Sequence, residues 1–160
     1  VDRIDNVFGG QYMWVEATRR ERLTVIPGDD PVDFASLLAE YVRSERRYRD
    51  ANGRRLALLH ARGPVALWGA GAKGVTFANL IDPRGELFSC VVDINAGKQG
   101  GYLVGTGHPI VAPAALRSMG VRSAVVLNPN YLAEIAALLR QESSDIELVD
   151  LSESCCETDH

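Results

Sequence analysis

A glycine-rich turn constrains the fold of this chain more than any other stretch. Gly69, Gly71 and Gly74 follow the pattern G-x-G-x-x-G. In a strand–turn–helix unit the first glycine permits the tight turn, the second lets the backbone approach a phosphate, and the third packs the helix against the strand. The apolar run 64–68 predicts a buried strand before the turn, and 75–81 predicts a helix after it, with its positive end facing a ligand.

The rest of the chain continues the alternation of strands and helices. Apolar stretches predict three further strands and helical patterns predict two further helices: strands over 87–93, 123–127 and 145–151, and helices over 113–119 and 131–141. This order indicates an α/β fold, a Rossmann-like three-layer αβα domain with a mostly parallel sheet of four core strands. We assign it residues 31–151, followed by a disordered polar tail, 152–160.

Residues 1–30 do not resemble the start of such a unit, and we interpret them as a connecting strand segment from a preceding domain. Residues 11–17 are rich in aromatic and β-branched side chains and predict a strand, which must pair either with the main sheet or with the preceding domain. Residues 27–30 predict a turn. Asp30 and Pro31 suit the N-cap and the first position of a helix.

Apolar residues recur at helical spacing between residues 31 and 61. The pair Asn52-Gly53 predicts a break or a kink that divides this stretch into two helices. Six arginines lie between Arg43 and Arg55. They form either a solvated helix face with ion pairs four residues apart or a patch that binds phosphate.

Composition limits the classes of function. A chain of 160 residues with 46% apolar content can bury the core of one domain. A net charge of −4 argues against general nucleic-acid binding, and no apolar run approaches the roughly 20 residues of a membrane span. We therefore expect no nucleic-acid or membrane partner. Three cysteines give neither a disulfide framework nor metal-ligand spacing, so we expect no metal and a cytoplasmic location, with Cys90 as a small core residue.

Two features follow the second predicted strand. Asp93 lies about 20 residues beyond the glycine-rich turn, where dinucleotide-binding folds keep an acid for a ribose hydroxyl, although a cap at the strand end is the alternative. Residues 95–110 then contain five glycines and no helical period, where an ordinary Rossmann unit has a helix. Long loops of this kind usually carry function.

Individual polar residues leave their roles open. His108 precedes a proline, and a structural hydrogen bond and a catalytic role are both compatible with that position. Asn130 either binds a ligand or caps the helix over 131–141. Because no acid–base or nucleophile–base pairing accompanies these residues, we assign no catalytic residue.

Several motifs occur together in one order: Trp68–Phe77, Val91–Asn95, Lys98–Gly100, Gly105–Ile110 and Asn128–Tyr131. They resemble the C-terminal Rossmann-like domain of the S-adenosylmethionine-dependent sugar C-methyltransferase family. The opening stretch Phe8–Met13 is similar to the segment that leads into that domain. The similarity extends over about residues 8 to 151.

This resemblance implies a function. Family members carry a small zinc-binding domain, a middle methyltransferase domain that binds S-adenosylmethionine, and this C-terminal domain, with a nucleotide-sugar between the last two. The chain is then a substrate-binding domain that acts with the methyltransferase domain of its own parent chain on a nucleotide-linked sugar or similar acceptor, and it is not expected to be catalytic alone. The residues expected around the cleft are Gly69, Gly71, Lys73, Gly74, Asp93, Asn95, Lys98, Gln99, Thr106, His108, Asn128 and Asn130.

Two other classes of function remain open at this point. The glycine-rich turn and Asp93 permit an NAD-binding oxidoreductase domain, although four core strands fall short of the six in a full dinucleotide-binding unit. A non-catalytic nucleotide sensor is the third class.

Overall fold

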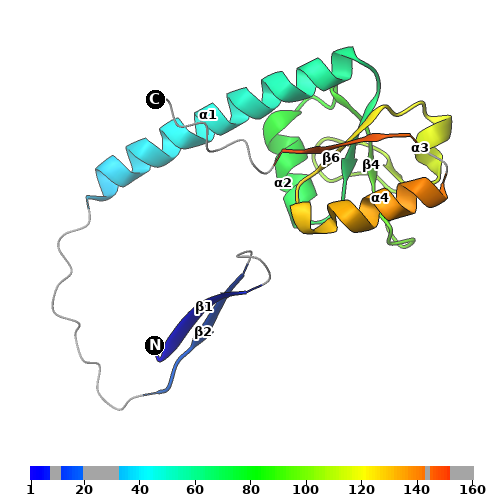
Figure 1. The fold of residues 1–160 in the computed structure, drawn as a ribbon. Helices are drawn as coiled ribbons and strands as arrows, with labels where there is room; N and C mark the ends of the chain where they lie inside the picture. Colours follow the sequence, from blue (N-terminus) through cyan, green and yellow to red (C-terminus); the bar gives the residue numbers. More distant parts are fainter. Residues whose placement is uncertain (8–11, 20–32, 143–144, 152–160) are drawn as a thin grey trace. The chain divides into compact units, whose positions relative to one another are not determined.

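The computed structural model describes residues 1–7, 12–19, 33–142 and 145–151. It divides into two compact units, Val1–Ala39 and Glu40–His160, which are considered separately (Figure 1). The turn expected at 27–30, the cap expected at Asp30 and Pro31, and the tail from residue 152 lie outside the described residues.

The first unit contains a β-hairpin. Strands β1 (Arg3–Val7) and β2 (Tyr12–Glu16) pair in antiparallel fashion, with Arg3 opposite Glu16 and Val7 opposite Tyr12. The strand expected over 11–17 is confirmed for the described residues 12–16. It pairs with β1, a short segment whose alternating polar residues gave no clear strand signal, and not with the five-stranded sheet of the second unit.

The second unit contains a five-stranded parallel sheet in the order β5-β4-β3-β6-β7. Its strands are β3 (Val65–Trp68), β4 (Phe88–Val92), β5 (Ile110–Val111), β6 (Ser123–Val126) and β7 (Glu147–Asp150). The expected Rossmann-like fold is confirmed, but the expectation of four strands was wrong. The fifth strand, β5, has only two residues, too few for a period-2 pattern in the sequence.

Helices cover both faces of this sheet and produce the three layers (Figure 1). Helix α2 (Ala72–Ile81) and the C-terminal half of α1 (Phe34–Ala61) share one buried cluster with inward residues of the sheet such as Leu67. Helices α3 (Ala115–Ser118) and α4 (Leu132–Gln141) pack on the opposite cluster, which contains Ala66. Buried residues therefore alternate between two faces along each central strand.

Cys90 belongs to the cluster under α3 and α4 and is completely buried in β4. Burial raises the pKa of its thiol to about 11. The thiol is therefore protonated at neutral pH, and Cys90 is confirmed as a core residue rather than a reactive one.

Helix α1 is continuous, so the break expected at Asn52-Gly53 was wrong. A glycine inside a helix costs about 1 kcal/mol relative to alanine. The surrounding residues offset this cost: Asn52 is completely buried and its Nδ2 donates to the Tyr48 carbonyl oxygen at 3.0 Å, while Leu56 and Leu59 are buried in the core. Packing of the C-terminal half of the helix therefore outweighs the local signal.

The arginines of α1 lie mostly on its exposed side. Arg49 pairs with Glu45 four residues earlier at 3.4 Å, and an Arg55 Nη2 donates to the Asp150 carbonyl oxygen at 3.2 Å. These contacts favour the interpretation as a solvated helix face. Within the described part of the chain, neither α1 nor any other helix offers an apolar stretch sufficient to cross a bilayer.

The segment between β4 and β5 contains no helix, as expected. It turns back on itself, so that Gly100 and Gly101 exchange backbone hydrogen bonds with Ile110. Asn79 on α2 holds its middle, because the side-chain amide donates to the Val104 carbonyl oxygen at 2.9 Å. We call residues 94–109 the crossover loop.

Candidate functional site

The glycine-rich turn lies at the point where the order of the strands reverses. Its residues follow β3, the chain then continues to β4 on one side, and it later returns to β6 on the other side. Trp68 at the end of β3 is opposite Val126 at the end of β6, so the turn and residues 127–130 leave the sheet next to each other. In open α/β sheets this crevice at the carboxyl ends of the strands is where ligands bind.

The three glycines have three different surroundings. Gly69 has a φ of +101°, a conformation that favours glycine. A Cβ on Gly74 would lie 1.9 Å from the Gly69 carbonyl oxygen, so only glycine lets α2 approach the turn. A Cβ on Gly71 would meet nothing within 4 Å. The backbone at Gly71 therefore borders open space, as the approach of a phosphate requires.

Helix α2 begins directly after Gly71, which serves as its N-cap without a side-chain hydrogen bond. The first N–H groups of a helix lack partners within the helix and carry its positive dipole end. At the start of α2 these groups belong to residues exposed at the surface, Ala72 and Lys73. The arrangement suits an anion placed over the turn.

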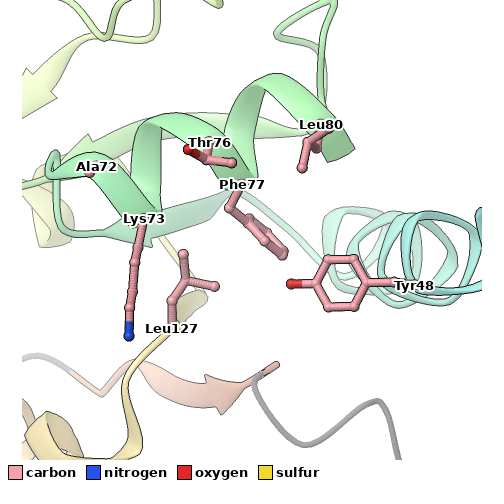
Figure 2. Close-up of a pocket in the computed structure, with 7 residues that line it drawn as sticks. All are labelled: Tyr48, Ala72, Lys73, Thr76, Phe77, Leu80 and Leu127. Atoms are coloured by element: carbon pink, nitrogen blue, oxygen red, sulfur yellow. The ribbon is translucent and has the colours of Figure 1, made fainter. Parts of the chain in front are cut away.

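An open groove of about 480 Å³ adjoins this helix start (Figure 2). Lys73, Thr76, Phe77 and Leu80 line it at helical spacing along α2, and the remaining wall comes from Tyr48, Ala72 and Leu127. The Tyr48 ring meets Phe77 edge-on, with ring centroids 6.5 Å apart. Of these residues the sequence had indicated only Lys73, although the i, i+3, i+4, i+7 pattern on α2 was a usable signal.

Asp93 links the end of β4 to the glycine-rich turn. One carboxylate oxygen accepts the Asn95 N–H at 2.9 Å. The other accepts the Ala70 N–H at 2.9 Å and pairs with the Lys98 ammonium at 2.8 Å. Asp93 therefore caps the end of its strand, as the structural alternative predicted. Its carboxylate accepts hydrogen bonds from three groups of the chain, those of Ala70, Asn95 and Lys98.

The same contacts set the ionisation of Asp93. Burial raises the pKa of the carboxyl, but the hydrogen bonds from Lys98, Asn95 and Ala70 lower it more, and the pKa ends below its ordinary value of 3.8. Because the folded-state pKa is the lower one, this stabilisation is present above about pH 4 and is lost as the pH falls through the folded-state pKa.

We expect the Asp93→Asn variant to lose less stability on acidification than the wild-type chain does. Asparagine cannot be protonated in this range, so the contribution of this group to the pH dependence disappears. The measurement is the free energy of unfolding in urea at several values between about pH 5 and pH 3. Equal slopes for the two proteins would show that the Lys98–Asp93 contact is absent in solution.

The neighbouring polar residues mainly shape the backbone. Asn95 accepts the Gly97 N–H at 2.9 Å, and the Gln99 amide donates to the Asp93 carbonyl oxygen at 2.9 Å. At the end of β6, Asn128 accepts the Asn130 N–H at 3.1 Å and caps η1 (Pro129–Tyr131). The expected capping by Asn130 was wrong, because the 3-10 turn that precedes α4 moves the cap to Asn128.

Thr106 and His108 do not join the residues around the turn. His108 is buried, its Nδ1 lies 2.7 Å from the Thr106 hydroxyl, and its Nε2 lies 3.2 Å from an Asp82 carboxylate oxygen. Asp82 follows α2 and precedes β4, at the amino edge of the sheet, whereas the glycine-rich turn lies at the carboxyl edge. Both residues thus fasten the far end of the crossover loop, which favours the structural alternative for His108.

Fold and turn together define a Rossmann-like α/β domain with a glycine-rich loop, an open groove beside it and an acid engaged by its own chain. Residues 31–145 match the family model described as C-methyltransferase C-terminal domain, and the chain therefore belongs to that family. A search among curated proteins gave no match. This match confirms the resemblance to the C-terminal domain of C-methyltransferases. It does not identify the molecule that accepts the methyl group.

Proposed function

We propose that this domain binds the methyl acceptor of a C-methyltransferase and that the acceptor is a nucleotide-linked sugar or a close analogue. Membership of the C-terminal domain family supports the methyltransferase part of the proposal. The observation that carries the acceptor class is the groove, whose wall includes Ala72 and Lys73 from the first turn of α2. The groove therefore joins a position that suits an anion to an apolar surface.

A nucleotide-sugar matches both parts of that arrangement. Its diphosphate fits the open space at Gly71, where the helix start and the Lys73 ammonium favour negative charge. Its base or sugar ring fits the groove, where Tyr48, Phe77 and Leu127 offer apolar contact. A volume of about 480 Å³ lies within the range of small-molecule sites.

S-adenosylmethionine belongs, in this proposal, to the methyltransferase domain of the same parent chain. This assignment is supported by Asp93, the carboxylate that would accept hydrogen bonds from the hydroxyls of an adenosine ribose, because it already accepts them from Ala70, Asn95 and Lys98. The bound sulfonium would supply the methyl group. The contribution of this domain is to bind and orient the acceptor against that partner domain.

We expect Gly71→Val to lower the affinity for a pyrimidine-nucleotide sugar such as dTDP-glucose about ten-fold or more, the scale of one lost charge-assisted hydrogen bond. The valine side chain would occupy the space through which the diphosphate reaches the backbone. The measurement is isothermal titration calorimetry, with S-adenosylmethionine titrated in parallel as the ligand expected not to bind.

The fold itself should tolerate this change. Gly71 has a φ of −92° and a ψ of −175°, an extended conformation that valine adopts, and open space around its Cβ position. A matched control is Gly53→Ala on α1, also in open space, which should leave the affinity unchanged. Wild-type affinity in Gly71→Val would exclude the glycine-rich turn as the diphosphate site.

A further inference from the structure

Lys98 covers the acid that dinucleotide-binding folds leave open. Its ammonium contacts Asp93 Oδ2 at 2.8 Å and donates to the Ala70 carbonyl oxygen at 3.3 Å. The Lys98 side chain is 39% exposed and the Asp93 side chain only 9% exposed. A ligand that lies over the glycine-rich turn thus meets the ammonium before it meets the carboxylate.

The position of Lys98 is fixed by its own loop. The Lys98 N–H bonds to the Asn95 carbonyl oxygen, Asn95 accepts the Gly97 N–H, and the adjacent Gln99 amide is held by the Asp93 carbonyl oxygen. These contacts bring a side chain from the crossover loop onto the turn after β3. The ammonium is therefore a built part of the carboxyl edge rather than a free surface charge.

Because the Lys98 ammonium covers the Asp93 carboxylate, a ligand at this position meets a hydrogen-bond donor where other dinucleotide-binding folds present an acceptor. In dinucleotide-binding folds the acid accepts hydrogen bonds from a ribose diol. An ammonium has three N–H donors and no acceptor. It can donate to phosphate, carboxylate, carbonyl or hydroxyl oxygens, most strongly to anionic ones, but it cannot accept the two hydrogen bonds that a ribose diol donates to a carboxylate. Two of its donors engage Asp93 and Ala70, which leaves the third for a ligand.

We propose that Lys98 determines which class of ligand the glycine-rich turn accepts, by selecting a second anionic or carbonyl oxygen at this position and by rejecting the ribose diol of a dinucleotide such as NAD. The inference rests on the proposed function in one respect, that the ligand is a nucleotide diphosphate. It adds the residue that distinguishes such a ligand from a dinucleotide.

The experiment compares two ligands, dTDP-glucose and NADH, by calorimetric titration of the 160-residue chain and its variants. The wild type is expected to prefer dTDP-glucose. In Lys98→Met the ratio of the two affinities should shift toward NADH about ten-fold or more, because a charge-assisted hydrogen bond to one ligand is lost and the Asp93 carboxylate becomes accessible to the other. Lys98→Arg should retain the wild-type preference.

A matched control is Arg84→Met, which also removes one positive charge. Arg84 is 81% exposed and pairs with Glu86 before β4, at the amino edge of the sheet, so the ratio should not change. If Lys98→Met does not fold, Lys98→Gln, which keeps a neutral donor, replaces it and should shift the ratio in the same direction.

The outcomes separate the two proposals. Binding of dTDP-glucose with an unchanged ratio in Lys98→Met would overturn the role of Lys98 and leave the proposed function standing. A wild-type chain that prefers NADH, or that binds neither ligand, would overturn both, since both place the ligand on residues of this chain.

Discussion

Gly74→Ala is expected to destabilise the domain by about 3 kcal/mol or more, the upper range for overpacking. The added methyl carbon would lie 1.9 Å from the Gly69 carbonyl oxygen. Because that oxygen belongs to the backbone, it cannot rotate away as a side chain would, and α2 must move off the turn. In an unconstrained helix the same substitution gains about 1 kcal/mol, so the sign of the effect is diagnostic.

Urea denaturation of the wild type and the variant measures this effect. Gly71→Ala is the matched control, since its methyl group would meet nothing within 4 Å, and its stability should lie within about 0.5 kcal/mol of wild type. Equal stabilities of the Gly74 and Gly71 variants would mean that α2 does not approach the turn as closely as described.

The Asp82→Ala variant is expected to lose about 3 kcal/mol or more of stability, since each buried donor left unsatisfied costs about 1–3 kcal/mol. The Asp82 carboxylate accepts the N–H groups of Glu86, Leu87 and Phe88, each at 2.9 Å, and lies beside His108. It therefore organises the entire turn that leads from α2 into β4.

Thermal and urea unfolding again provide the measurement, here with Asp145→Ala as the control. Asp145 is an exposed loop residue, so its loss should change stability by no more than about 0.5 kcal/mol. Similar losses in the two variants would argue that water replaces the carboxylate at the amino edge of the sheet.

The sequence predicted the architecture because its strongest signals were local. The runs that became β3, β4 and β6 are continuous and apolar, as strands buried on both faces must be, and the glycine spacing predicted the turn between β3 and α2. Each of these signals depends on residues close together in the chain. Such features can be predicted without knowledge of the tertiary structure.

The errors occurred where tertiary contacts outweighed local patterns. At Asn52-Gly53 the helix continues because Asn52 and Leu56 are buried in the core. Strand β5 is defined by its pairing with Val91 and Val92, not by its own two residues. Neither outcome is visible in the composition of the segment itself.

The candidate site was predicted in part for the same reason. Gly71, Asp93 and Lys98 do lie together at the carboxyl edge, because each follows a strand of one parallel sheet or a short loop after it. His108 lies at the opposite edge, because the crossover loop traverses the height of the sheet before β5 begins. The order of residues in the sequence does not show which edge of the sheet each part of such a loop reaches.

The fastening of the crossover loop affects how a ligand is bound. Lys98 on Asp93, Val104 on Asn79 and His108 beside Asp82 hold it at three levels of the sheet, each through a contact within the chain itself. When a loop becomes ordered only on binding its ligand, the loss of conformational entropy lowers the affinity. In this domain the loop loses that entropy when the chain folds. The surface at the glycine-rich turn is therefore preorganised, and a ligand binds there without the cost of ordering the loop.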